Sequence, residues 1–177
     1  GADSLTNTLI NKFPSVFRNV IGTVTDLSHT IKLKKNASPV IHKVRPVPLS
    51  VREDLKKLLD KLCSDGNIQP TDSSEWVSPA GLARKRSGDL RLCVDLRSLN
   101  QNIVVDCHPL PLIQDLLGNV SEAKYFSTLD LHSAYHQIAL AKESQDLTTF
   151  VTPFGSFQFK RLPFGLVSAA SCFQQIM

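Results

Sequence analysis

The sequence predicts an α+β fold, in which helices pack against an antiparallel sheet made of hairpins. A helix is indicated by residues 50–62, where apolar side chains recur at helical spacing. Two hairpins are indicated by residues 80–96 and 148–165, in which β-branched and aromatic residues flank turns that contain glycine. The chain has 177 residues, 42% of them hydrophobic and 20% charged, so one large or two small domains with a packed core are expected.

The first 46 residues are expected to form a helix followed by an extended arm. Apolar residues recur at helical spacing over residues 4–13, and Pro14 then ends the pattern. Residues 29–46 alternate and are then interrupted by prolines, which exclude a helix there.

The clearest predicted helix begins at Ser50. The stretch SVRE has the pattern of a capping box, with Ser50 at the N-cap and Glu53 at the third helical position, and such a cap is worth about 1 kcal/mol. Gly66 suits the left-handed position after the helix. The apolar face indicates an ordinary packed helix and consists of Val51, Leu55, Leu58, Leu59 and Leu62.

The middle of the chain predicts a hairpin and a short helix. The apolar stretches 80–83 and 90–96 flank the turn sequence KRSGD, which places cations at the hairpin tip or beside it. Residues 109–118 begin with prolines and end with glycine, which indicates a short helix. Further along, TPFGSFQFKRLPFG is a second turn-rich hairpin, and residues 168–177 should begin another helix.

The stretch STLDLHSAYHQI raises a chemical question, because it predicts a strand over residues 124–131 with Asp130 between two leucines. An ionised carboxylate that is buried without partners is very costly. Asp130 is therefore a helix cap, a paired core charge, a general base or a metal ligand, and its neighbours alone do not choose between these roles.

Charge and cysteine content narrow the classes of function. The net charge is +4, and residues 84–91 carry four cations and one aspartate. Such a basic cluster suits a phosphate or nucleic-acid partner, but composition alone favours the alternative of a solvated surface loop. The four cysteines, Cys63, Cys93, Cys107 and Cys172, form no CxxC pair. They therefore support neither a zinc site nor a secreted disulfide framework, and reduced thiols in the cytoplasm, or alternatively the nucleus, are expected.

Other common sites are not supported by the sequence. His132 and His136 are four residues apart, but the catalytic glutamate of an HExxH motif is missing. The sequence contains no glycine-rich phosphate loop and no G-x-S-x-G elbow. We also expect no membrane partner, because no signal peptide or sufficiently long apolar run is seen.

Three ordered segments change the balance between these alternatives. They are SSEWVSPAGLARKRSGDLRLCVDLRSLNQNI, HPLPLIQDLLGNVSEAKYFSTLDLHSAYHQI and TTFVTPFGSFQFKRLPFGLVSAASCFQQIM. Together they strongly resemble the reverse transcriptase of Gypsy-type long-terminal-repeat retrotransposons, and more distantly that of retroviruses. The resemblance covers about residues 29–177, and LTNTLINKFPSVF resembles the segment that often precedes this domain.

The resemblance implies a right-hand polymerase fold, with fingers and the first half of a palm. The implied division is a lead segment and arm at 1–46, fingers at 47–104 and 138–168, palm at 105–137, and the start of a truncated palm helix at 169–177.

The resemblance also implies a role for Asp130. In that family the LDL aspartate ends a palm strand and binds two Mg²⁺ ions, which serve the attacking 3′-hydroxyl and the leaving pyrophosphate. Asp130 occupies that position, as the implied catalytic and metal-binding carboxylate, and Leu131 should offer its backbone carbonyl to the same metals.

Nucleotide-binding residues carry over from the family in the same way. Tyr135 matches the bulky steric gate that rejects a ribose 2′-hydroxyl, and Phe164 matches the floor of the nucleotide pocket. Lys85 and Arg91 lie where the fingers hairpin grips the incoming triphosphate, with Arg84 and Arg86 as competitors for the role of Lys85.

Template and primer contacts are implied for four further residues. Gly165 matches a template contact, and Arg97 in VDLRSLN is either template-facing or structural. Trp76 and Pro79 match positions that shape the template groove, although a tryptophan in a turn-rich segment also serves as packing.

Some positions depart from the family pattern. Arg86-Ser87-Gly88 stands where the family usually has aspartate in the fingers turn, and the SAASCF stretch replaces the usual proline and threonine by Ala170 and Cys172. The family also needs a downstream YxDD pair of aspartates, whereas the last aspartate of this chain is Asp146. One carboxylate does not hold two Mg²⁺ ions, so we expect the chain alone not to polymerise DNA.

Two functions follow as expectations. The first is part of an RNA-directed DNA polymerase, with dNTPs, an RNA or DNA template-primer, and the remaining palm, thumb and RNase H as partners. The alternative is a non-catalytic, domesticated module that binds nucleic acid or protein. A palm sheet divided midway exposes an unpaired strand edge, so self-association through that edge is also expected.

Overall fold

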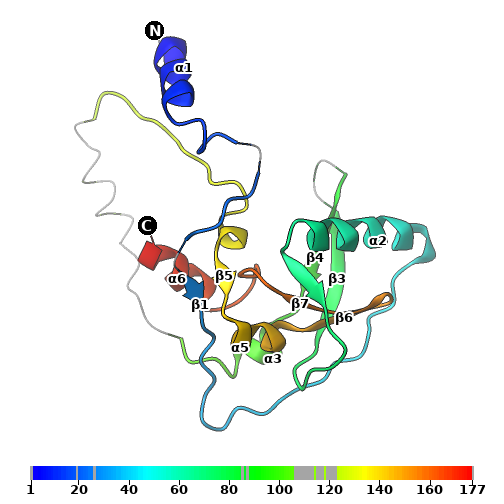
Figure 1. Cartoon of the computed structure of the whole chain (residues 1–177). Helices are drawn as coiled ribbons and strands as arrows, with labels where there is room; N and C mark the ends of the chain where they lie inside the picture. The colour runs from blue at the N-terminus through cyan, green and yellow to red at the C-terminus, as the bar shows by residue number, and fades with distance from the viewer. Residues whose placement is uncertain are drawn as a thin grey trace.

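A five-stranded sheet lies beside helix α2, on the right in Figure 1. The computed structural model describes residues 2–18, 20–25, 27–84, 86, 88–105, 114, 118 and 123–176. The strand order is β2-β7-β6-β3-β4, and every neighbouring pair is antiparallel except β3 and β6. The strands are β2 (Ile68–Pro70), β3 (Ser78–Arg84), β4 (Leu90–Val94), β6 (Phe150–Thr152) and β7 (Gly155–Phe159).

This sheet joins two distant parts of the sequence. The strands β2, β3 and β4 precede residue 105, whereas β6 and β7 follow residue 138, and the β3–β6 pairing links the two groups. A separate parallel pair is formed by β1 (Ser28–His29) and β5 (Ala139–Leu140). The predicted α+β fold is therefore confirmed.

Both predicted hairpins are present. In the first, β3 and β4 pair from Ala80 opposite Val94 to Arg84 opposite Leu90, and Gly88 in the turn has a φ of 91°, which favours glycine. In the second, β6 and β7 pair across a short turn, and the Thr152 hydroxyl donates to the Gly155 carbonyl at 2.9 Å.

Helix α2 (Leu49–Ser64) crosses the sheet and covers one face of it (Figure 1), burying Leu55 and Leu59. The predicted Ser50 capping box is wrong, because Pro48, two residues earlier, is the N-cap, Leu49 begins the helix, and no side-chain hydrogen bond caps it. Glu53 instead pairs with Lys57 at 3.2 Å.

The other end of α2 agrees with the prediction. Gly66 has a φ of 70°, and its N–H donates to the Cys63 carbonyl at 3.0 Å. The N–H of Asn67 donates to the Leu62 carbonyl at 2.9 Å, which completes a Schellman ending.

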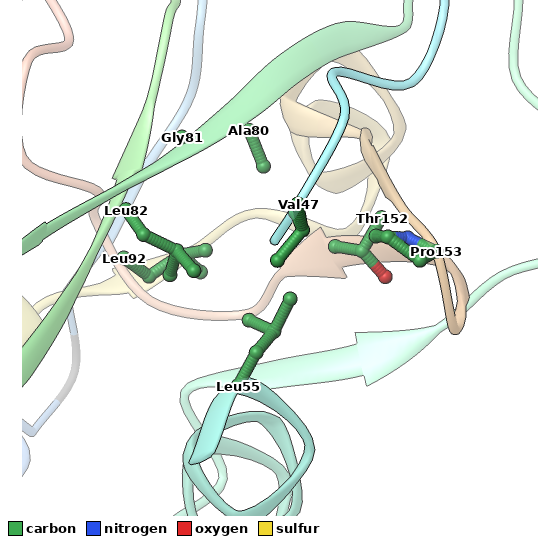
Figure 2. Close-up of a pocket in the computed structure, with 8 residues that line it drawn as sticks. All are labelled: Val47, Leu55, Ala80, Gly81, Leu82, Leu92, Thr152 and Pro153. Carbon is green, nitrogen blue, oxygen red and sulfur yellow. The ribbon is translucent and has the colours of Figure 1, made fainter. Parts of the chain in front are cut away.

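An apolar pocket lies between α2 and the sheet, and Figure 2 shows its lining residues converging from α2 and the segment before it, from β3 and β4, and from the end of β6. Because no charged side chain lines it, this pocket is a packing seam between helix and sheet. The lining consists of Val47, Leu55, Ala80, Gly81, Leu82, Leu92, Thr152 and Pro153.

Aromatic residues belong to the same buried core as the apolar face of α2. Phe150 is fully buried, and its ring centroid lies 5.9 Å from that of Phe157 and 5.2 Å from that of Phe159. Trp76 and Leu162 belong to the same buried cluster.

The remaining helices are short, apart from α1, which lies away from the sheet (Figure 1). Both the N-terminal helix and the last helix were predicted, and the predicted helix at 109–118 falls mostly outside the described residues. None of the helices that the structure describes is long and apolar enough to cross a membrane. Besides α2, the helices in the described part of the chain are α1 (Ala2–Lys12), α3 (Arg97–Asn100), η1 (Ala134–Gln137), α5 (Lys142–Gln145), η2 (Asp146–Thr148) and α6 (Ala169–Ile176).

The predicted strand at 124–131 is wrong. Residues 123–131 have no regular structure and pair with no other described segment. Tyr125 is 93% exposed and Leu129 is 84% exposed, so neither enters a core. A strand is stable only when a neighbour accepts its hydrogen bonds and covers its apolar face, and the described residues supply neither.

Candidate nucleotide-binding site

Three of the predicted nucleotide-binding residues meet at one surface. The Arg91 guanidinium carbon lies over the Phe164 ring, 5.0 Å from its centroid. The Tyr135 ring meets Phe164 edge-on, with centroids 5.3 Å apart and planes at 63°. The residues come from β4, η1 and the loop after β7, so the fold brings together a cation and two aromatic rings that are distant in sequence.

The loop that carries Phe164 is anchored on both sides. Leu162 and Pro163 before it and Leu166 after it are buried, whereas Phe164 is 41% exposed. Gly165 has a φ of 88°, which an L side chain adopts only with strain. The loop therefore presents the ring of Phe164 outward from a fixed base.

Asn100 in α3 ties this loop to the first part of the sheet. Its side-chain amide donates to the Gly165 carbonyl at 2.8 Å, and its side-chain oxygen accepts from the Val167 N–H at 2.9 Å. This role of Asn100 was not predicted from the sequence. The SLN stretch gives no local sign of a partner far along the chain.

Tyr135 is wedged between two phenylalanines. Its ring centroid lies 5.8 Å from that of Phe173 in α6, with the planes at 86°, and Phe164 covers another side. The turn before it needs Ser133 at a φ of 50°, and the His136 N–H then donates to the Ser133 carbonyl at 2.9 Å. Tyr135 is half-buried, so one part of it faces solvent.

His136 is a second residue of this site that was not predicted from the sequence. Its ring meets Phe164 edge-on, with centroids 5.1 Å apart. Burial, and then Coulombic repulsion from Arg161 and Arg91, lower the pKa of the His136 imidazole below its ordinary value. The imidazole is therefore neutral at pH 7 and packs as a ring.

The arginines near the site differ in the hydrogen bonds that their guanidinium N–H groups donate. Arg84 donates to the Gly88 carbonyl at 3.2 Å, which closes the hairpin tip. Arg91 is exposed and makes no side-chain hydrogen bond or ion pair with the described part of the chain. Its N–H donors therefore remain available to an anion. Lys85 lies outside the described residues.

Arg97 is held differently, by a carboxylate. Its Nε and one terminal nitrogen donate to the two oxygens of Asp95 at 2.8 and 2.7 Å, and Arg45 donates to the same carboxylate at 2.8 Å. The hydrogen bond from Arg97, with the further bond from Arg45, holds the pKa of the Asp95 carboxyl well below its usual range. Arg97 is 83% exposed, so a template contact stays a prediction beside this structural role.

Trp76 and Pro79 lie inside the protein. Trp76 is 6% exposed and belongs to the core, and Pro79 is a buried residue of β3 opposite Val151. Their burial shows packing, and a direct template contact by either side chain stays a prediction.

Asp130 and Leu131 lie in the exposed segment that follows residue 122. The Asp130 carboxylate makes no hydrogen bond or ion pair with the described residues. No group of three or more His, Cys, Asp or Glu side chains is placed to hold a metal ion in the described part of the chain. A free, solvated carboxylate suits a hard cation that keeps water and phosphate ligands, so Asp130 fits as one ligand of a shared site.

Comparison with known proteins gives a consistent result. A family model described as reverse transcriptase (RNA-dependent DNA polymerase) matches residues 83–177. The chain is 32% identical to the Pol polyprotein of transposon opus from Drosophila melanogaster, over all of this chain and 18% of that protein. It is 39% identical to the corresponding polyprotein of transposon 412, over 88% of this chain and 13% of the relative. The chain therefore spans less than a fifth of the length of these relatives.

Solved structures show the same fold at low sequence identity. A foamy viral protease–reverse transcriptase in complex with an RNA/DNA hybrid has a TM-score of 0.84 at 20% identity, over 98% of this chain and 24% of that one. A foamy viral protease–reverse transcriptase dRH in complex with double-stranded DNA has a TM-score of 0.77 at 19% identity, over 98% of this chain and 30% of that one.

Proposed function

Because the chain belongs to the reverse transcriptase (RNA-dependent DNA polymerase) family, we propose that it supplies the fingers and first half of the palm of a retrotransposon RNA-directed DNA polymerase. The observation that carries this proposal is the meeting of Arg91, Tyr135 and Phe164 at one exposed surface. That surface combines a cation with free donors and two aromatic rings, which suits a nucleoside triphosphate.

Each of these residues has a role that its environment supports. Arg91 donates to the phosphate oxygens of the incoming dNTP, since its planar fork matches phosphate geometry. Tyr135 lies beneath the sugar and excludes a 2′-hydroxyl by its bulk, because Phe164 and Phe173 prevent its ring from moving aside. Phe164 forms the floor against which the nucleotide packs.

Asp130 is proposed as one ligand of the catalytic metals. When bound, Mg²⁺ neutralises the phosphates and lowers the pKa of the attacking hydroxyl. Asp130 contributes a carboxylate that is already solvated and unpaired, and the Leu131 carbonyl follows it along the backbone. The remaining ligands are expected from the dNTP, water and other carboxylates of the complete polymerase.

A template-primer is the proposed nucleic-acid partner. The hairpin formed by β3 and β4 carries the exposed cations Arg84, Arg86 and Arg91, and exposed Arg97 follows it in α3. The foamy viral relatives are described as complexes with an RNA/DNA hybrid and with double-stranded DNA. Binding through such cations weakens as salt rises, because counterions are released from the nucleic acid.

The test is a titration of the full chain with dTTP and with the matching ribonucleotide, UTP, in the presence of Mg²⁺. Arg91→Ala should weaken dTTP binding by about tenfold or more, since a hydrogen bond to a charged group is worth about 1.5–3 kcal/mol. Arg52→Ala, on the outer part of α2, is the matched control and should leave binding unchanged.

The same titration tests the role of Tyr135 independently of Arg91. Tyr135→Ala should admit UTP and reduce the preference for dTTP, whereas Tyr125→Ala, at the other tyrosine of the chain, should not. Equal dTTP affinity in the wild-type and Arg91→Ala chains, with no change in sugar preference in Tyr135→Ala, would overturn the proposal.

A further inference from the structure

We propose that Phe164 is a positioning residue, which holds the Arg91 guanidinium by its face so that the N–H edge stays free for the triphosphate. This inference rests on the proposed function, because it assigns Arg91 to the triphosphate. It adds a contact between two distant parts of the chain that sets where the triphosphate-binding cation lies.

The geometry explains why a ring suits this task better than a carboxylate. A guanidinium attracts anions through five N–H donors that lie in its plane, while its face contacts an aromatic ring. Arg97, which pairs with Asp95, uses its donors on a carboxylate of the protein. Arg91 is held through its face at 5.0 Å and makes no ion pair with the described residues.

The ring of Phe164 is itself held in place. Tyr135 and His136 meet it edge-on with plane angles of 63° and 66°. Asn100 fixes the backbone on the far side through its bonds to Gly165 and Val167. A fixed ring restricts Arg91, a long and exposed side chain, to fewer rotamers, and this reduces the entropy that Arg91 loses when it binds an anion.

His136 makes the arrangement sensitive to pH. The charged groups that face its ring are Arg91 from β4 and Arg161 from the segment after β7, and both are cations. Protonation of His136 would add a third positive charge beside Phe164 and repel Arg91. Because burial and these two cations lower the pKa of His136, the contact should weaken only as pH falls well below about 6.5, the ordinary pKa of histidine.

The experiment has a structural readout that needs no nucleotide. In an NMR spectrum of the full chain, the side-chain protons of Arg91 should be shifted upfield by the ring current of Phe164. The shift should be lost in Phe164→Leu, kept in Phe164→Tyr, and lost as the pH is lowered in the wild-type chain. Phe154→Leu is the matched control, because Phe154 has the same 41% exposure but lies in the turn between β6 and β7.

The second readout is affinity for inorganic tripolyphosphate and for dTTP. Phe164→Leu should weaken both by about twofold to fivefold, the range expected for an exposed cation–π contact, while Phe164→Tyr should restore affinity. If Phe164→Leu does not fold, two measurements still test the role of Phe164. One compares the wild-type chain and Phe164→Tyr with Phe154→Leu, and the other is the pH series on the wild-type chain.

The two readouts separate failure of this inference from failure of the proposed function. Intact dTTP binding with no upfield shift of Arg91, or with a shift and unchanged affinity in Phe164→Leu, would overturn the role of Phe164 alone. Absence of tripolyphosphate and dTTP binding in a wild-type chain that shows the shift would overturn the nucleotide site and the positioning role together.

Discussion

Replacing Asn100 by alanine should loosen the loop that carries Phe164. The change removes two hydrogen bonds, from the Asn100 amide to the Gly165 carbonyl and from the Val167 N–H to the Asn100 oxygen, at 2.8 and 2.9 Å. A net hydrogen bond contributes about 0.5–1.5 kcal/mol. Because water reaches this half-buried site and replaces part of each bond, we expect a loss of about 1–2 kcal/mol in the free energy of unfolding.

Urea unfolding of the full chain measures this loss. With a typical dependence of about 1–3 kcal/mol per molar urea, the midpoint should fall by about 0.3–2 M. Asn102→Ala is the matched control, because Asn102 also makes two hydrogen bonds, to Ser98 and Ser38, but none to the Phe164 loop. Both variants should lose stability, and only Asn100→Ala should also lose dTTP affinity. An unchanged midpoint and unchanged affinity in Asn100→Ala would refute the anchoring argument.

Three further predictions concern the core, acid stability and the thiols. Thr148→Val should destabilise the chain by about 1–3 kcal/mol in urea unfolding, because it leaves the buried Phe159 N–H unpaired, while Thr148→Ser should restore stability. The pKa of Asp95 is lowered by folding, so this carboxylate stabilises the fold above its unfolded pKa of about 3.9, and the stabilisation is lost as pH falls. In urea unfolding, Asp95→Asn should therefore lower the free energy of unfolding at pH 7 and make it decline less steeply between about pH 5 and 2. A decline as steep as in the wild type would contradict this. When the native chain is alkylated and the modified peptides are followed by mass spectrometry, exposed Cys93 should react long before buried Cys172, because burial raises the pKa of the Cys172 thiol. Equal alkylation rates of the two thiols would contradict the packing of α6.

The hairpins were predictable from sequence because the information that forms them is local. Gly88 and Gly155 lie in the two turns, and both adopt positive φ values that glycine tolerates best. The end of α2 at Gly66 was predictable for the same reason. In each case a few adjacent residues determine the backbone, and no distant partner is required.

The start of α2 shows where a local pattern fails. Ser50 and Glu53 fit a capping box by spacing, but the pattern does not fix which residue opens the helix. Pro48 is held in an extended conformation at φ −54° and ψ 141°, and Leu49 already begins the helix. The predicted N-cap was therefore two residues too late, because the backbone conformation at Pro48, before the SVRE motif, determines where the helix begins.

The candidate site was predictable only in part. The resemblance identified Arg91, Tyr135 and Phe164, and the fold brings all three together. It did not identify Asn100 or His136, because their partners, Gly165 and Phe164, lie far away in sequence. Such contacts depend on tertiary packing, for which a single sequence contains no local pattern.

The exposed segment 123–131 is the clearest conflict between sequence and structure, and the conflict indicates what the segment lacks. Burying a large apolar side chain stabilises by about 1.5–3 kcal/mol, while ordering a residue costs about 1–2 kcal/mol. In a strand only every second residue faces a given core, so two residues must be ordered for each apolar side chain that is buried. The free energy gained by burying Leu129 or Leu131 therefore barely balances the entropy cost of ordering two residues. Backbone hydrogen bonds must therefore supply the difference, and a bare apolar surface would not suffice. We expect residues 123–131 to become ordered only beside another strand, which would at the same moment fix the position of Asp130.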